Sequence, residues 1–245
     1  MKQVPRAVVF LFLILLGVSL LAPPHLTAEE PSGKELKREM ELWLNTSAGK
    51  RYKTKEEEFY RLLETAGLAG IPLSLMWERI ALGAARRIEP LPLLNALEED
   101  LVRFSSVNRI IKTSNFYFSS REEATLLLKG FYTFLIGGLE IGTLDGILSL
   151  AVLNGKDSEA VLALGTLILK VHQSFRPKEA NLTQIAEAVF NSKISPSSYD
   201  SLAAFFVKAR TVPLTFQNTL DIFISVLSRG GGILQLEQEL SRRSR

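Results

Sequence analysis

Residues 120–155, SREEATLLLKGFYTFLIGGLEIGTLDGILSLAVLNG, hold the local signals that decide the fold of this chain. They open with Ser120-Arg121-Glu122-Glu123, a capping box in which the serine accepts a hydrogen bond from a free helical amide and the glutamate returns one. A helix is predicted over 124–136, followed by a glycine-punctuated turn and a shorter helix over 143–153 that stops at an Asn-Gly pair. The stretch therefore predicts two helices joined by a short turn.

The same combination of caps, apolar stripes and breaks recurs along the chain, and no convincing strand pattern interrupts it. Helix pairs are predicted to begin at Ser32, Pro72, Ser120, Asp157 and Ser197, a spacing of about 40 residues that suits stacked αα repeats. Because each pair exposes an apolar face until a neighbour covers it, we predict an all-α fold of stacked helical hairpins. The uneven spacing leaves an α-solenoid-like array and an irregular helical bundle both open.

Three further patterns carry expectations about individual helices. Thr54-Lys55-Glu56-Glu57 has the form of another capping box, with Thr54 at the start of a helix. The acidic run Glu98-Glu99-Asp100 is expected to form a solvated helix face, because a metal site would need carboxylates that converge from fixed offsets. Later helices are predicted at about 182–191, 197–209, 214–228 and 233–242.

The N-terminus has the pattern of a secretory signal peptide. Lys2 and Arg6 precede an apolar run over residues 7–22, and two prolines then lead to Leu26-Thr27-Ala28 before Glu29. The run is shorter than the roughly 20 residues that span a bilayer, which favours a cleaved leader. An uncleaved leader that contacts the membrane through residues 7–22 is the alternative, and no cysteine follows that could be acylated.

This interpretation sets the domain organisation and the compartment. Residues 1–28 are predicted to be a signal peptide, and residues 29–245 a single all-helical domain of about five helix pairs, which is within the usual domain size. The mature protein is expected in the bacterial periplasm or outside the cell.

Composition excludes several kinds of site. Of the 245 residues 47% are apolar and 22% charged, as in a globular protein. Removing Lys2 and Arg6 from the 29 basic residues leaves 27 against 26 acidic ones, a balance that does not indicate nucleic acid. The absence of cysteine excludes thiol catalysis and thiolate metal sites, and His172 is the only histidine outside the leader. No metal, cofactor or nucleic acid is therefore predicted.

His172 is the obvious candidate for proton transfer, since a Ser-His-Asp triad needs an imidazole. It lies near the end of a predicted helix, where a histidine can satisfy terminal carbonyl groups. No serine lies in a Gly-x-Ser-x-Gly elbow. No catalytic residue is predicted, and the chain is not expected to be an enzyme.

One short stretch nevertheless supports an enzymatic alternative. Glu64-Thr65-Ala66-Gly67-Leu68-Ala69-Gly70 resembles the glutamate segment of lytic transglycosylases, although it lacks that family's Gly-Leu-Met-Gln run at the corresponding distance and a matching downstream tyrosine motif. The resemblance implies a glycan-cleaving envelope enzyme with Glu64 as the general acid.

The segment 108–119 is predicted to be a connector and contains the candidate binding residues. Aromatic side chains beside basic ones can anchor a partner, whereas Phe116 and Phe118 folded under the loop would plug the hairpin groove instead. The candidates are Arg109, Lys112, Phe116, Tyr117 and Phe118.

A binding or scaffold module for a protein, peptide or lipid of the bacterial envelope is the function that these observations favour, with another envelope protein or peptide as the expected partner. Arrays of helical hairpins work by offering a surface and need no reactive side chain. A glycan-cleaving enzyme and a membrane-tethered structural protein with an uncleaved leader are the alternatives.

Overall fold

The computed structural model describes residues 33–243, and the chain divides into two compact units, one up to Ser105 and the other from Ser106. Within the described residues there are eleven α-helices and two short 3₁₀ helices, and no β-strand. The all-α prediction is confirmed. The predicted leader, residues 1–28, lies outside the described residues. Among residues 33–243, no helix combines the length and the hydropathy of a membrane-spanning segment.

An aromatic cluster forms much of the core of the first unit. The ring of Trp43 stacks on that of Tyr52 with centroids 5.4 Å apart and meets the edge of Trp77 at 5.8 Å. The Tyr52 hydroxyl donates to the carbonyl of Ile88 at 2.7 Å, so its polar end is satisfied inside the core. The elements of this unit are α2 (Gly33–Leu44), η1 (Lys50–Lys55), α3 (Glu56–Leu68), α4 (Leu73–Ala85) and α5 (Pro90–Thr113), which continues past Ser105.

The capping box predicted at Thr54 is wrong. Helix α3 begins at Glu56 with Lys55 in the N-cap position, and no side chain makes a cap hydrogen bond there. Thr54 instead lies inside the 3₁₀ helix η1, which leads directly into α3. The three glutamates of the first turn of α3 stabilise the helix start through the helix dipole in place of a cap.

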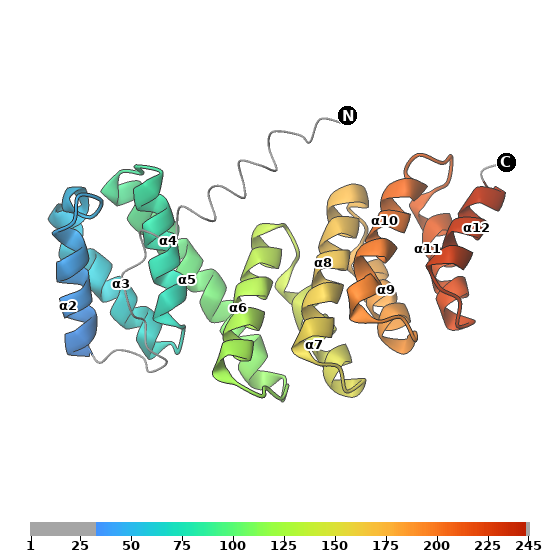
Figure 1. Cartoon of the computed structure of the whole chain (residues 1–245), viewed down its shortest axis with the longest axis horizontal. Helices are drawn as coiled ribbons and strands as arrows, with labels where there is room; N and C mark the ends of the chain where they lie inside the picture. The colour runs from blue at the N-terminus through green and yellow to red at the C-terminus, as the bar shows by residue number, and fades with distance from the viewer. Residues whose placement is uncertain (1–32, 244–245) are drawn as a thin grey trace. The chain divides into compact units, whose positions relative to one another are not determined.

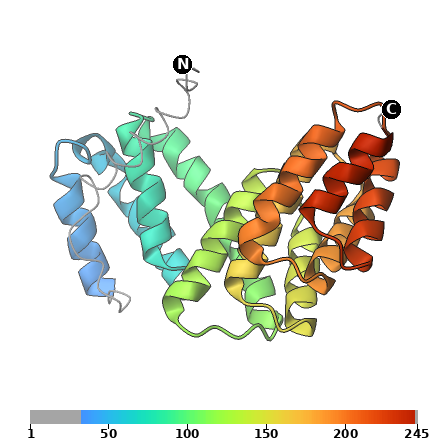
Figure 2. The ribbon, with the colours of Figure 1, turned by 45° about the vertical axis from the view of Figure 1, so that its right-hand side comes forward.

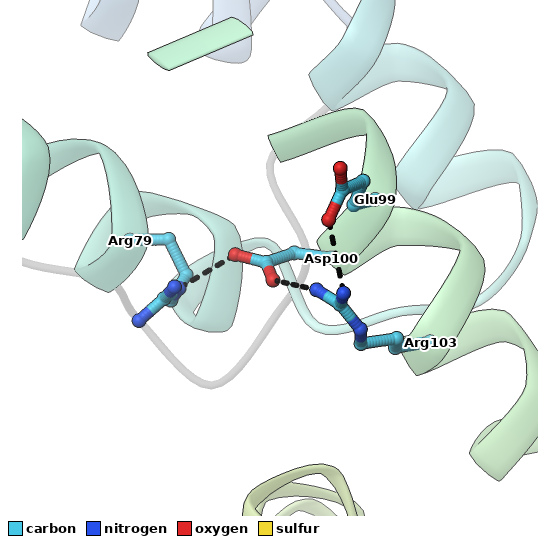
Figure 3. Close-up of polar contacts among 4 residues, drawn as sticks. All are labelled: Arg79, Glu99, Asp100 and Arg103. Atoms are coloured by element: carbon cyan, nitrogen blue, oxygen red, sulfur yellow. Dashed lines mark hydrogen bonds and ion pairs between the residues drawn. The ribbon is translucent and has the colours of Figure 1, made fainter. Parts of the chain in front are cut away.

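The expectation of a solvated face at residues 98–100 is also wrong for Asp100, which is 2% exposed. Figure 3 shows its carboxylate between two guanidinium groups: Arg79 Nε donates at 2.7 Å and Arg103 Nη1 at 3.2 Å, while Arg103 Nη2 bonds Glu99 at 2.9 Å. The carboxylate is buried because it lies in the same stripe of α5 as Leu97 and Phe104. Two guanidinium partners offset the cost of burying its charge.

The second unit is an array of hairpins in two layers. In one layer α6 packs on α8, α8 on α10 and α10 on α12; in the other α7 packs on α9 and α9 on α11, as Figures 1 and 2 show. The stacked-hairpin prediction is therefore confirmed in this unit. Its elements are α6 (Arg121–Ile136), α7 (Ile141–Leu153), α8 (Ser158–Phe175), α9 (Glu179–Asn191), η2 (Pro196–Ser198), α10 (Tyr199–Ala209), α11 (Phe216–Ser228) and α12 (Ile233–Arg243).

Helices α6 and α8 interlock through glycines, one of them the C-cap residue of α6, that each receive a large side chain of the other helix. Gly130 receives Leu162, Gly165 receives Phe134 and Gly137 receives Leu169, since a Cβ at any of these glycines would overlap that side chain. In these three pairs the residue number rises along α6 as it rises along α8, so the two helices run parallel. Their N-termini consequently lie at the same end of the array.

Three helices of this unit begin earlier than predicted, and the first of them, α6, begins at Arg121 rather than at 124. Helix α7 begins at Ile141 rather than at 143, and α9 begins at Glu179 rather than near 182. The Thr143 hydroxyl donates to the Glu179 carboxylate at 3.3 Å, which places that negative charge at the first turn of α7. Helix α9 thus supplies a negative charge at the start of α7, where no local side chain makes a cap hydrogen bond.

Candidate functional site

A hollow of about 520 Å³ opens in the second unit, within the size range of ligand pockets. The α5–α6 loop forms one wall, and the end of α7 with the turn into α8 forms the other. The residues around it are 115–117, 119, 123, 151, 152 and 155–157. The hollow therefore brings part of the predicted binding segment together with residues that lie about one hairpin further along the chain.

The aromatic residues of the loop divide between the interior and the surface. Phe116 is buried, and its ring centroid lies 5.1 Å from that of the half-buried Phe118. Tyr117, between them, is 84% exposed and lines the hollow, as does Phe116. The two phenylalanine rings pack against each other, whereas the side chain of Tyr117 is exposed to solvent.

The two basic candidates lie elsewhere. Helix α5 runs to Thr113, so the prediction of a connector beginning at 108 is wrong, and the physical reason is that buried Ile110 and Ile111 continue the apolar stripe of the helix. Arg109 and Lys112 are exposed on the last turns of α5, and neither lines the hollow. The loop itself begins at Ser114.

A carboxylate clasp fixes this loop to two helices. Oε2 of Glu123 accepts hydrogen bonds from the backbone N–H of Ser119 at 2.7 Å and from its hydroxyl at 2.6 Å, while Oε1 accepts from the Ser158 hydroxyl at 2.6 Å. These hydrogen bonds, first of all the one from Ser119, lower the pKa of Glu123 to about 2. The ionised carboxylate of Glu123 therefore links α6, on which it lies, to the loop and to the first residue of α8.

The capping box predicted at 120–123 is confirmed in one of its two halves. The Ser120 hydroxyl oxygen accepts from the N–H of Glu123 at 3.1 Å, as a cap should. The Glu123 carboxylate, however, bonds Ser119 and Ser158 as described above and not the amide of Ser120. The glutamate of the predicted capping box thus forms the clasp instead of capping the helix start.

The opposite wall of the hollow carries one carboxylate and one ammonium group. Asp157 caps α8, because its Oδ1 accepts from the N–H of Ala160 at 2.8 Å. Within residues 33–243 this carboxylate makes no other hydrogen bond or ion pair, and it is exposed. Burial raises the pKa of Tyr199, and the nearby charge of Asp157 raises it further. The ammonium group of Lys156 lies 5.9 Å above the ring of Phe190.

From the sequence, Glu123 and Asp157 are interpreted only as helix-start signals and Lys156 belongs to no pattern, so none of the three is predicted as a site residue. The signal that could have found them is the repeat itself. The first helices of successive stacked hairpins run parallel, so the starts predicted at Ser120 and Asp157 must lie at the same end of the array.

The other candidates from the sequence are not gathered at this hollow. His172 is half-buried on α8 near the Gly138 turn, and its Nδ1 atom is buried with no hydrogen-bond partner in residues 33–243, so this atom does not satisfy the helix's terminal carbonyls. Glu64 is exposed on α3. Nowhere in the described part of the chain do three histidine, aspartate or glutamate side chains meet in a way that could hold a metal ion.

The chain was also compared with known proteins. No protein-family model, no curated protein and no solved structure matches it.

Proposed function

We propose that this chain is an exported binding module, and that the hollow between the α5–α6 loop and the α7–α8 turn is its site for a polypeptide segment of a partner. Tyr117 is the observation that carries the proposal, because a tyrosine that is 84% exposed in the wall of a hollow loses apolar contact unless a partner covers it. Tyrosine is among the residues that dominate binding energy at interfaces.

Several contacts within the protein hold the loop around Tyr117, which supports this role. Phe116 packs beneath it, and the Glu123 clasp holds Ser119 at its other end. Asn115, at the start of the loop, has a φ of +57°, and the neighbouring N–H of Phe116 donates to the Ser114 hydroxyl oxygen at 3.2 Å. A preorganised anchor loses little conformational entropy on binding, so more of its contact energy appears as affinity.

A polypeptide suits the chemistry of the hollow better than a uniform acyl chain does. Aromatic and aliphatic side chains, Tyr117 and Val152 among them, lie in the same hollow as the charged groups of Glu123, Lys156 and Asp157. A peptide presents both apolar and polar side chains and can therefore match both kinds of group in this lining.

Selection from a random peptide display library on the full chain tests the proposal. We expect enriched peptides to bind Tyr117→Ala at least about tenfold more weakly than the unmodified chain, the usual loss at an aromatic hot spot. Leu68→Ala is the matched control, because Leu68 is an equally exposed apolar residue in the other unit, and it should leave affinity unchanged. Failure to enrich any peptide, or equal binding by Tyr117→Ala, would contradict the proposal.

Export is part of the same proposal and is tested separately. Mass spectrometry of the protein isolated from the periplasm or the culture medium should find a mature N-terminus at Glu29, as the leader pattern predicts. An intact N-terminus in the membrane fraction would favour the tethered alternative instead.

A further inference from the structure

The charged groups of the hollow are not equally available to a ligand. Glu123 already accepts three hydrogen bonds, and its charge is committed to the clasp between the loop and α8. The ammonium group of Lys156 lies over the ring of Phe190, which gives it a cation–π partner within the protein. Asp157 is therefore the charged group with most capacity left for an incoming molecule.

The oxygen of Asp157 that is available to a ligand is Oδ2. Oδ1 is occupied by the N–H of Ala160, and no partner within residues 33–243 engages Oδ2. A carboxylate offers about four lone-pair positions and forms its strongest hydrogen bonds with cationic donors. Because Asp157 lines the hollow, such a donor would come from the bound molecule.

Tyr117 adds a second element of cation recognition in the same hollow. The face of an exposed phenol ring attracts an ammonium or guanidinium group, and arginine in particular stacks on aromatic rings. The two carboxylates and one ammonium group around the hollow give it a net charge of −1. A cationic segment is thus favoured, and an anionic one would meet two carboxylates.

We infer that the polypeptide bound in this hollow carries an arginine or lysine, whose cation contacts the carboxylate of Asp157 and the ring of Tyr117. The inference rests on the proposed function and adds the chemical class of the partner. It also separates peptides from anionic lipid, since a phosphate headgroup would face the same carboxylates.

Asp157→Asn is the decisive variant, because asparagine caps helices as well as aspartate does and removes only the charge. Selected peptides should contain arginine or lysine more often than the starting library. Their affinity for Asp157→Asn, measured by fluorescence anisotropy, should fall about tenfold, and replacing that basic residue by glutamine should have the same effect on the unmodified chain. Glu64→Gln, which neutralises an exposed carboxylate of the other unit, is the matched control and should bind normally.

The outcomes separate this inference from the proposed function. Peptides that need Tyr117 but show no basic enrichment and bind Asp157→Asn normally would overturn the inference alone. If no peptide binds, the proposed function fails and the inference fails with it. Preferential binding of phosphatidylglycerol vesicles over phosphatidylcholine vesicles, lost in Tyr117→Ala, would also overturn the inference. Asp157→Ser, which keeps a capping oxygen, repeats the test if the asparagine variant shows an altered circular dichroism spectrum.

Discussion

Glu123 is bonded at both carboxylate oxygens, through Ser119 on one side and Ser158 on the other. At the scale of single residues, this arrangement makes the shape of the hollow depend on one ionised group. The pKa of Glu123 is about 2 in the folded chain, against an ordinary value of 4.5. Its negative charge therefore favours the folded state, and the favourable contribution is complete above pH 4.5.

Acid should remove this contribution between pH 4.5 and about 2, because the carboxylate becomes protonated in the unfolded chain first and in the folded chain last. We expect Glu123→Gln to be less stable than the unmodified chain at pH 7, and the difference in free energy of unfolding to shrink as the pH falls through this window. Urea denaturation at a series of pH values measures it. A difference that stays constant with pH would show that the charge of Glu123 makes no such contribution.

At the scale of secondary-structure elements, the placement of glycines sets how closely α6 and α8 approach each other. Gly165 of α8 lies against the ring of Phe134 of α6, whereas Gly146 of α7 has no atom within 4 Å of the position a Cβ would take. Both glycines are inside helices, so alanine gains helix propensity at either site. Only at position 165 would the methyl group of the alanine have to displace a packed ring, that of Phe134.

Replacing these glycines by alanine should therefore have opposite effects. Gly165→Ala is expected to destabilise the chain by about 1–3 kcal/mol through overpacking, and Gly146→Ala to stabilise it by about 0.5–1 kcal/mol. Denaturant titration followed by circular dichroism measures both. Adding Phe134→Leu to Gly165→Ala should restore part of the loss, and a stabilising Gly165→Ala alone would contradict the interlocked packing of α6 and α8.

At the scale of the whole molecule, the chain divides into two compact units. The aromatic cluster around Trp43 and the buried Asp100 belong to the first unit, and the interlocked helices α6 and α8 belong to the second. Because a chain of this kind can open unit by unit, local stability is better followed by hydrogen exchange than by a single unfolding transition.

Asp100→Ala should raise amide exchange within residues 33–105 far more than within residues 106–243. The variant leaves Arg79 and Arg103 without their buried partner, at an expected cost of about 1–3 kcal/mol, because both guanidinium groups can still reach water. Glu99→Ala is the matched control, since it removes an exposed partner of the same Arg103, worth at most about 1 kcal/mol. Equal effects of the two variants would contradict a structural role for the burial of Asp100.

The sequence by itself determined the all-α class and where the hairpins of the second unit begin, because caps, breaks and helical periodicity act between residues a few positions apart. It also placed Tyr117 among five candidate binding residues, of which Arg109 and Lys112 do not line the hollow. Only the tertiary structure decided that Asp100 is buried, that Glu179 supports the start of α7, and that Tyr117 and Asp157 share one hollow. These juxtapositions join residues some 20 to 40 positions apart, and they depend on how helices pack rather than on any local signal.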